Sequence, residues 1–481
     1  MGLLSLLPAW ALRALRRFML RQGRRMGVPQ MLARSKKGAV RAVVRAAQSS
    51  AAYQTILREH GADLHALSSA TGWAALPVLT KAHTFGRFPL AALSRAMPAG
   101  DIADVLTSSG RGGRSFGFRL TARPQHEAGW FDIDLGLQDA FGVDDTPTLL
   151  VNCLPMGVVF RSHAVAVANV SVRADMACSI LRDVGPQFGQ TIVCTDPLFI
   201  RALLAEAQAA GVDWSALNTS FIFGEEVLVE AQRDYIAART GIDLDNHPSR
   251  WVGSSFGVGE LGLNLLFETR ETIKMRRTLR AQPPLAALLG WHEGASEVPS
   301  VFCYNPLRCF VEVLNPNADG FGELCITMLD AAAVIPLPRF ATGDVGRCFS
   351  PTEVAQLAEL AKTPVPWLPV VAVRGRIQDR PAGMPSVECV KEWLYQDHAI
   401  ADQLTGAFRL SQGSNGRTRL VVQTLSEASA KSAELCAQLG ALCQQNERFL
   451  VDLELLGPEA FPGRPVLDFE RKFMYVSQDA S

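Results

Sequence analysis

The 481-residue chain lacks the features that mark several large classes of protein. Its 47 basic and 47 acidic residues leave a formal net charge of zero, so no surplus of positive charge is available to capture nucleic acid. No uninterrupted apolar run in its N-terminal segment reaches the roughly 18 residues of a membrane-spanning helix. The ten cysteines include no C-x-x-C pair, which favours reduced thiols in a cytoplasmic protein over a disulfide framework. With no internal repeat either, composition and length predict a globular protein of two or more domains.

Acidic residues are missing from the N-terminal segment, residues 1–50, which is rich in arginine and lysine. Arginines interrupt its apolar part and no small-residue cleavage site follows, so the segment does not resemble a signal peptide. One interpretation is an amphipathic helix that makes peripheral contact with an anionic membrane. The charge pattern favours the other interpretation, a basic helical hairpin that packs on the main domain with a solvated face.

Strand-like runs alternate with helical patterns between residues 148 and 270. "TLLVNCLP" is followed by the helical pattern "AVAVANVSVRADMACSILRDV", "QTIVCTD" by "PLFIRALLAEAQAAG", and "TSFIFGEE" by "VLVEAQRDYIAARTG". Strand followed by helix at this spacing predicts a parallel sheet with helices on its faces. Ligands of such sheets bind beyond the carboxyl ends of the strands, so we expect the loops that follow these strands to line a site.

The pattern changes after residue 301 to shorter β-rich pieces, and the segment "KTPVPWLPVVAVRGRIQDRPAG" marks a domain boundary. The last hundred residues are typical of strand, turn, strand, helix and strand, at 406–412, 413–416, 417–425, 426–445 and 448–456. The predicted fold class is α/β. A large N-terminal domain at 51–376 has mostly parallel sheets flanked by helices, and a small α+β domain follows at 377–481.

One glycine-rich stretch, "LTSSGRGGRSFG" at residues 106–117, combines a flexible backbone with hydroxyls and fixed positive charge. These are the groups that a protein offers to a phosphate. The stretch has no lysine and the wrong spacing for a GxxxxGK[ST] loop, and Ser115 stands where a GxGxxG fingerprint needs its last glycine. A phosphate loop and a plain surface turn therefore both remain open for this stretch alone.

Three later stretches place charged residues beside glycines: "WVGSSFGVGELG" contains Glu260, "FATGDVGR" contains Asp344, and "VRGRIQDR" contains Arg376 and Asp379. One carboxylate can hold a divalent metal on a phosphate chain. Another can accept the hydroxyls of a ribose, and an arginine can bind sugar or phosphate. Each stretch alone also fits a turn with a solvated charge, but their joint occurrence in this order favours a nucleotide site.

The order of these motifs resembles the adenylate-forming superfamily, and within it the phenylacetate–CoA ligase-like branch, over roughly residues 40–480. "SSGRGGRS" at 108–115 is similar to the family's "SSGTTGKP", and "FGVGE" at 256–260 to its "YGxTE". "GEL" at 322–324 and "TGD" at 342–344 match directly, and "GRIQD" at 375–379 resembles "GRxDD". "LPVLTK", "FIFGEE" and "RKFMYV" resemble an N-terminal motif, the turn beside the adenine, and the tail with a catalytic lysine.

The resemblance implies a two-step reaction, in which a carboxylate attacks ATP to give an acyl-adenylate and pyrophosphate, and a nucleophile then takes the acyl group. It assigns the catalytic roles to Lys472 and to Glu260, the latter also as the ligand of Mg²⁺ bound with ATP, and the hinge of a mobile C-terminal domain to Gln378. It assigns the phosphates to Ser108, Ser109, Gly110, Gly112, Gly113, Arg114 and Ser115. It assigns the adenine and ribose to Gly224, Glu225, Phe256, Gly257, Asp344 and Arg376. Candidates for the acyl pocket are Phe160, His163, Phe223, Ser254 and Ser255.

Several positions depart from the family pattern. Arg114 replaces the loop lysine, Arg111 and Gly112 replace threonines, Gly259 replaces the threonine before the glutamate, and Arg471 replaces the glycine before Lys472. The implied acceptor is a thiol, with CoA first and a carrier protein second, and the implied substrate is a small carboxylic acid. Two alternatives stay open: an amine acceptor, and a non-catalytic relative that binds nucleotide or acyl ligand.

Cys303, Cys309 and Cys325 raise the question of a zinc site. Their spacing, with no fourth ligand apparent, is poor for zinc. The sequence favours buried thiols that pack as small hydrophobic side chains.

Overall fold

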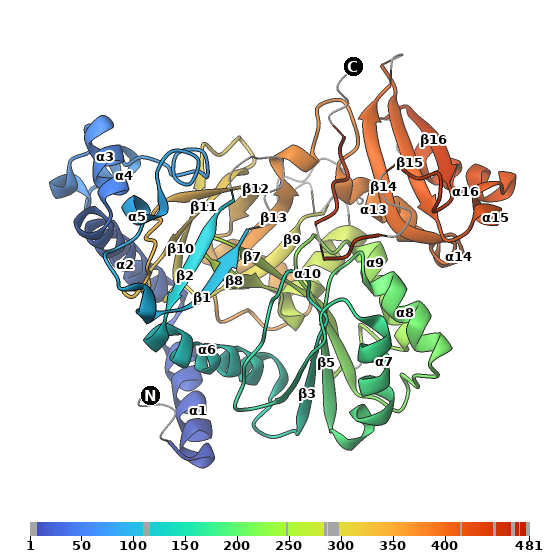
Figure 1. Ribbon diagram of the computed structural model, residues 1–481, viewed down its shortest axis with the longest axis horizontal. Helices are drawn as coiled ribbons and strands as arrows, with labels where there is room; N and C mark the ends of the chain where they lie inside the picture. The colour runs from blue at the N-terminus through green and yellow to red at the C-terminus, as the bar shows by residue number, and fades with distance from the viewer. Residues whose placement is uncertain are drawn as a thin grey trace.

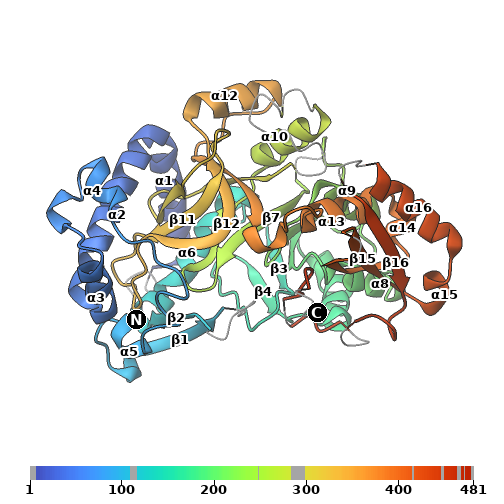
Figure 2. The same ribbon diagram turned by 90° about the horizontal axis from the view of Figure 1, so that it is seen from above.

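The computed structural model describes most of the chain as one α/β assembly (Figures 1 and 2). The described residues are 7–108, 116–246, 249–282, 286, 298–413, 416–445, 449–462, 467–470 and 472–477. Figure 1 shows N-terminal helices at one end, a large central sheet with helices on its faces, and a small sheet at the opposite end.

The central sheet has eleven strands in the order β10-β11-β12-β13-β9-β8-β7-β6-β5-β3-β4. One half, from β7 to β4, is parallel. Every residue of β3 and β5 is buried, as expected for parallel strands that are covered on both faces. The strands of this half are β3 (Thr148–Asn152), β4 (Ala166–Asn169), β5 (Gln190–Thr195), β6 (Thr219–Phe223) and β7 (Val252–Val258).

Alternate residues of the parallel strands face two different layers of helix. Leu149 and Val151 of β3 pack on one side, against α7 (Ala174–Asp183), α8 (Ile200–Ala209) and α9 (Glu230–Thr240). Leu150 lies on the other side, with Ile192 of β5 and the inner face of α6 (Arg123–Phe141). This period of two places helices on both faces of the sheet, as the sequence predicted.

The other half of the sheet is antiparallel from β7 through to β10. Its strands are β8 (Gly262–Phe267), β9 (Ser300–Tyr304), β10 (Cys309–Leu314), β11 (Gly322–Met328), β12 (Phe340–Cys348) and β13 (Val370–Arg376). One face packs on α10 (Arg270–Ala281) and α12 (Pro351–Leu360). The cysteines at 303, 309 and 325 are buried in β9, β10 and β11, and burial raises the pKa of each thiol.

The N-terminal helices pack on separate parts of the large domain. Helix α1 (Ala9–Met26) lies against α6, while α2 (Val28–Ser49) lies against β10 and β11. The expected helical hairpin is therefore wrong, because the two helices pack on different parts of the large domain rather than on each other. Three short helices and a hairpin follow: α3 (Ala51–Glu59), α4 (Ala70–Ala74), α5 (Leu90–Leu93), β1 (Ile102–Thr107) and β2 (Phe118–Ala122). Most of the glycine-rich stretch, 109–115, lies outside the described residues.

The small C-terminal sheet has the order β14-β15-β16. Strands β14 and β15 are antiparallel, and β15 pairs in parallel with β16 across a helical connection. The elements after β13 are α13 (Val387–Gln396), α14 (His398–Ala401), β14 (Leu404–Gln412), β15 (Thr418–Thr424), α15 (Glu427–Ala430), α16 (Ala433–Gln444) and β16 (Val451–Leu456). Helix α13 packs against α9, so the hydrophobic core runs from the large sheet into this unit.

Two local expectations were wrong. The pattern at 164–184 predicts one helical stretch, but its first part is strand β4, because valine alternates with alanine along 164–168 and β-branched residues favour the extended chain. The predicted helix at 426–445 is two helices, because Ser426 and Ser432 each accept a hydrogen bond from a backbone N–H three residues on and so start a new helix. Among the described residues, no helix is both long enough and apolar enough to cross a membrane.

Candidate active site

A cavity of about 1770 Å³ opens beyond the carboxyl ends of the parallel strands, between the large sheet and the C-terminal unit. Most of the sequence-predicted residues that the structure describes line it. They are Ser108, Phe160, Gly224, Glu225, Ser254, Ser255, Phe256, Gly257, Glu260, Asp344, Arg376 and Lys472. Of the predicted phosphate loop, Ser109, Gly110, Gly112, Gly113, Arg114 and Ser115 lie outside the described residues.

Lys81 joins the base of the predicted phosphate loop to Glu260. Its Nζ donates a hydrogen bond to Ser108 Oγ at 2.9 Å and lies 2.7 Å from Glu260 Oε1. The Glu260 side chain is only 1% exposed, whereas that of Lys81 is 40% exposed and reaches the cavity. Because burying a lone carboxylate is costly, the Lys81 ammonium stabilises the ionised Glu260. The sequence motif "LPVLTK" carries this lysine, but its position in the motif gave no reason to place it here.

Two glycines allow this close packing. A side chain at Gly117 would collide with the Glu260 carboxylate. A Cβ at Gly259 would lie 3.1 Å from both Cα and Cβ of Ser108. A side chain at position 259 would therefore crowd Ser108, whose backbone and Cβ lie beside this glycine.

Asp344 and Arg376 face each other across neighbouring strands. They are paired residues of β12 and β13, so the register of the sheet sets their approach. Asp344 is buried, and burial raises the pKa of its carboxyl, while the nearby Arg376 and Lys472 oppose that rise. A buried carboxylate at a cavity wall with cations beside it can accept hydrogen bonds from the hydroxyls of a sugar.

Lys472 comes from the C-terminal tail and reaches the turn after β6. Its Nζ lies 3.0 Å from Glu225 Oε2, and Glu225 adopts a positive φ of 70° in that turn. Next to it, Glu470 accepts hydrogen bonds from Ser171 Oγ at 2.7 Å and from Met156 N at 2.9 Å. The tail is thus held on the large domain, with the lysine in the wall of the cavity.

A second group beside this turn was not predicted from the sequence. Lys391 Nζ and the Tyr475 hydroxyl both donate hydrogen bonds to Glu226 Oε2, at 2.8 and 2.7 Å. Burial, with the charge of Glu226 added, raises the pKa of Asp196 to about 7. A pattern of single charges far apart in sequence gives no signal for such a cluster. Lys391 of α13 and Tyr475 of the tail meet Glu226 only in the folded chain, where α13 packs on α9.

The acyl-pocket candidates separate into two groups. Phe160 and Ser255 line the cavity, and so does Ser254, although its hydroxyl already donates to Glu268 Oε2 at 3.0 Å. The prediction was wrong for Phe223 and His163, which are not in the cavity lining. Phe223 is fully buried on the α7–α9 side of the sheet. His163 is exposed and stacks on Trp130, with the ring centroids 4.0 Å apart. Gln378, the predicted hinge, lies in the short turn Ile377–Asp379 directly after β13.

Sequence reasoning missed the main apolar wall of the cavity. This wall is formed by side chains of α6 and by those side chains of the parallel sheet that face α6. Its members include Leu137, Phe141, Leu150, Leu154, Ile192 and Ile222. The continuous apolar runs of β3 and β5 were the available signal, because every second side chain of a strand must face the same layer.

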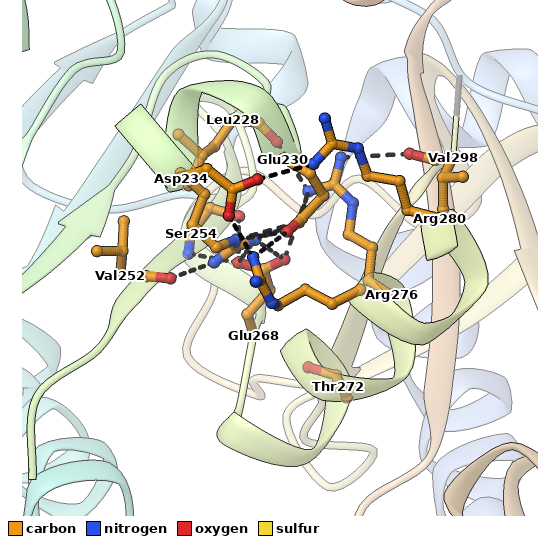
Figure 3. A network of polar contacts seen from close by, with 12 residues as sticks. Leu228, Glu230, Asp234, Val252, Ser254, Glu268, Thr272, Arg276, Arg280 and Val298 are labelled. Carbon is orange, nitrogen blue, oxygen red and sulfur yellow. Dashed lines mark hydrogen bonds and ion pairs between the residues drawn. The ribbon is translucent and has the colours of Figure 1, made fainter. Parts of the chain in front are cut away.

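A buried cluster of charged side chains contacts strand β7, which leads to Glu260 (Figure 3). Arg233 donates to Glu268 at 2.8 Å and to Glu230 at 3.0 Å, and Arg276 lies 3.2 Å from Glu230. Burial alone would raise the pKa of Glu230, but the guanidinium groups of Arg233 and Arg276 outweigh it and hold that pKa below its ordinary value. Since Glu268 also accepts from Ser254 N at 2.8 Å, the cluster fixes the strand that leads to Glu260.

Comparison with known proteins adds a fold relationship. No protein-family model matches the chain, and no curated protein matches it in sequence. Among solved structures, 2-hydroxyisobutyryl-CoA ligase in the postadenylation state with 2-HIB-AMP is similar, with a TM-score of 0.68 and 14% identity over 95% of this chain and 91% of that chain. The same ligase with R3-HIB-AMP gives a TM-score of 0.66 and 13% identity over the same shares. The expected fold is confirmed.

A further structure of the same ligase, in its thioesterification state with 2-HIB-AMP and CoA, has a TM-score of 0.54 and 14% identity over 94% of this chain and 90% of that chain.

Proposed function

We propose that this chain is an ATP-dependent ligase that activates a carboxylic acid as an acyl-adenylate and passes the acyl group to a thiol, with CoA as the first candidate. The observation that carries the proposal is the convergence of Ser108, Glu260, Asp344, Arg376 and Lys472 on one cavity. A fold shared with a ligase that binds an acyl-AMP supports it. The phenylacetate–CoA ligase-like branch is the proposed subgroup, and the cytoplasm is the proposed location.

In the first step, an oxygen of the substrate carboxylate attacks the α-phosphorus of ATP. The bond from that phosphorus to the bridging oxygen breaks, and the electron pair leaves with pyrophosphate. Ser108 and Lys81, at the base of the loop, are placed to bind the leaving pyrophosphate, where negative charge grows. Lys472 is proposed to bridge the carboxylate and the α-phosphate, and Asp344 and Arg376 to hold the ribose.

Mg²⁺ fits this cavity as part of a metal–nucleotide complex. Among the described residues, no group of three or more histidines, cysteines, aspartates or glutamates could hold a metal by itself. Mg²⁺ usually takes one or two carboxylates together with substrate phosphates, and Glu260 is a buried carboxylate beside Ser108. Mg²⁺ bound in this way would supply positive charge for the leaving group. Glu260 would hold it, and Lys81 would shift from Glu260 towards phosphate oxygens.

In the second step, a thiolate attacks the acyl carbon, and AMP leaves. We propose that the domain at 377–481 turns about Gln378 relative to the domain at 51–376 between the two steps, which would carry Lys472 away from the cavity. A carrier-protein thiol or an amine acceptor is the alternative for this step. The apolar wall on α6 and the parallel strands favours an acid with a hydrophobic body.

The proposal is tested by pyrophosphate release from ATP and Mg²⁺ over a panel of aryl, fatty and amino acids, with and without CoA. We expect release with one class of acid and stimulation by CoA. Glu260→Gln should abolish release, while Glu359→Gln, an exposed change of the same type, should not. ATP binding without release from any acid would favour the non-catalytic alternative, and release that survives Glu260→Gln would overturn the site assignment.

A further inference from the structure

The outer face of helix α1 exposes large apolar side chains among arginines. The side chain of Trp10 is 73% exposed and that of Phe18 is 58% exposed. At 100° per residue these two share an arc of about 140° with Arg13, Arg17 and Arg21. Exposed aromatic residues interleaved with arginines are unusual for a solvated surface, where charged residues of both signs normally mix.

The inner face of α1 is firmly docked, so the orientation of the outer face is set by the fold. Leu12 packs with Trp130 and Phe131 of α6. Arg16 is buried and forms ion pairs with Asp134 and Asp144. The hydrophobic contacts of α1 with the core are therefore made by its inner face, and the apolar residues on its outer face are exposed in the docked helix.

The outer arginines have an excess of positive charge. Arg13, Arg21 and Arg25 form no ion pair within the described part of the chain, and the first acidic residue of the sequence is Glu59. Arg17 is paired with Asp145 at 2.6 Å, so it contributes less. A basic face with tryptophan and phenylalanine matches the interface of an anionic bilayer, where aromatic rings sit at headgroup depth and arginines bind phosphates.

The same helix borders the cavity described above. Met19, Leu20 and Arg24 line it, on the side of the apolar wall formed by α6. Figure 1 shows α1 beside α6, at the end of the molecule away from the C-terminal sheet. A bilayer that meets the outer face of α1 would therefore lie close to the acyl end of the cavity.

We propose that α1 binds an anionic lipid surface through Trp10, Phe18, Arg13, Arg21 and Arg25. We also propose that the acid activated by this chain is lipophilic and enters from that surface. The second part rests on the proposed ligase function, whereas the first part does not. In this arrangement, the outer face of α1 contacts headgroups and its inner face forms the rim of the acyl cavity.

The test is co-sedimentation of the full chain with vesicles of phosphatidylcholine alone and with 30% phosphatidylglycerol, at low and high salt. We expect binding to the anionic vesicles only, weakened by salt. Replacing Arg13, Arg21 and Arg25 with Gln should lower the partition coefficient roughly 100-fold, at about 1 kcal/mol per arginine. Trp10→Ser with Phe18→Ser should also lower it, because the apolar insertion is lost.

Matched control variants test whether a loss of vesicle binding is specific to the outer face of α1. The variant with Arg58→Gln, Arg173→Gln and Arg182→Gln makes the same change in net charge at other exposed positions. The variant with Leu360→Ser and Leu450→Ser removes two other exposed apolar side chains. These should bind vesicles as the parent does. Equal loss in the controls, equal binding to neutral vesicles, or self-association through α1 in sedimentation velocity would overturn the proposal.

The delivery step has its own readout. If the ligase function holds, pyrophosphate release should be faster when a long-chain acid is presented in anionic vesicles than when it is presented with albumin, and the arginine variant should lose that difference alone. Vesicle binding without pyrophosphate release from any acid would overturn the proposed ligase function but would support the proposed lipid-binding surface. Release with an equal rate from both sources would overturn delivery from the membrane.

Discussion

At the scale of single residues, the family resemblance located the charged residues of the cavity that lie within a recognisable motif. It did not locate the charged residues that reach the cavity only through the packing of the folded chain. Glu260, Asp344 and Lys472 sit beside glycines or in a motif-like tail, and each lines the cavity. Lys81 precedes Ser108 by 27 positions, and nothing in the spacing indicates that the β1–β2 ribbon brings the two together. Its place follows from the burial of Glu260, which requires a cation that the sequence alone does not identify.

The variant Lys81→Met should bind ATP more weakly than the parent but should bind AMP almost as well. Because Lys81 stands at the base of the phosphate loop, we expect ATP to bind roughly 10 to 100 times more weakly, as for one hydrogen bond to a charged group, and AMP to bind within about twofold of the parent. Calorimetric titration with both nucleotides measures this. Lys431→Met, an exposed change of the same type, is the control.

The stability of that variant needs its own check, since Glu260 loses its ion-pair partner. Lys81→Met should lower the melting temperature, and the double variant with Glu260→Gln should recover most of the loss, because a neutral amide is less costly to bury than a carboxylate. Equal weakening of ATP and AMP binding in a folded Lys81→Met protein would show that Lys81 does not act at the outer phosphates.

At the scale of elements, sequence patterns predicted the parallel strands well and their partners less well. β3 and β5 are continuous apolar runs that are buried on both faces, which is the pattern that the sequence shows. Strand β4 was missed because it lies at the edge of the sheet, where its burial is partial and its alanines also fit a helix. The break between α15 and α16 depends on serine caps that a hydrophobic pattern does not record.

Helix α13 begins with a buried carboxylate close to the proposed hinge. Burial raises the pKa of Glu388 to about 7, and Arg380 opposes that rise. The folded state then holds a proton that the unfolded state releases near pH 4.5, so stability from this group is complete below that pH and is lost as pH rises towards 7. We expect Glu388→Gln to be more stable than the parent at pH 8 and to show a flatter pH dependence between pH 5 and 7.

Urea midpoints at pH 5, 6, 7 and 8 for both proteins test this expectation. The slope should fall rather than vanish, because burial also raises the pKa of Asp196 and of Glu392 to about 7. Glu434→Gln on the exposed face of α16 is the control for removal of a charge. Parallel curves for Glu388→Gln and the parent would mean that Glu388 stays ionised in the folded state.

At the scale of the whole molecule, the sequence predicted two unequal domains but not how they meet. The core is continuous from the parallel sheet through α13 to β14 and β15, and Glu470 fastens the tail to Ser171. Such contacts join residues hundreds of positions apart, so no local pattern reveals them. The contact of Glu470 with Ser171 also keeps the nearby Lys472 in the lining of the cavity.

A two-step mechanism with one mobile domain predicts that Lys472 serves only the first step. Lys472→Ala should slow pyrophosphate release by roughly 100 to 1000-fold, the usual effect of removing one group that stabilises developing charge. Transfer from a purified acyl-adenylate to CoA should stay within a fewfold, because that step would run with the lysine turned away. Glu225→Gln breaks the same ion pair from the other side but keeps the ammonium, so it should slow pyrophosphate release far less than Lys472→Ala. Because Glu225 is one of the proposed adenine and ribose residues, its effect should appear mainly as a higher KM for ATP. An equal loss in both half-reactions would mean that Lys472 holds the two domains together rather than acting on the α-phosphate.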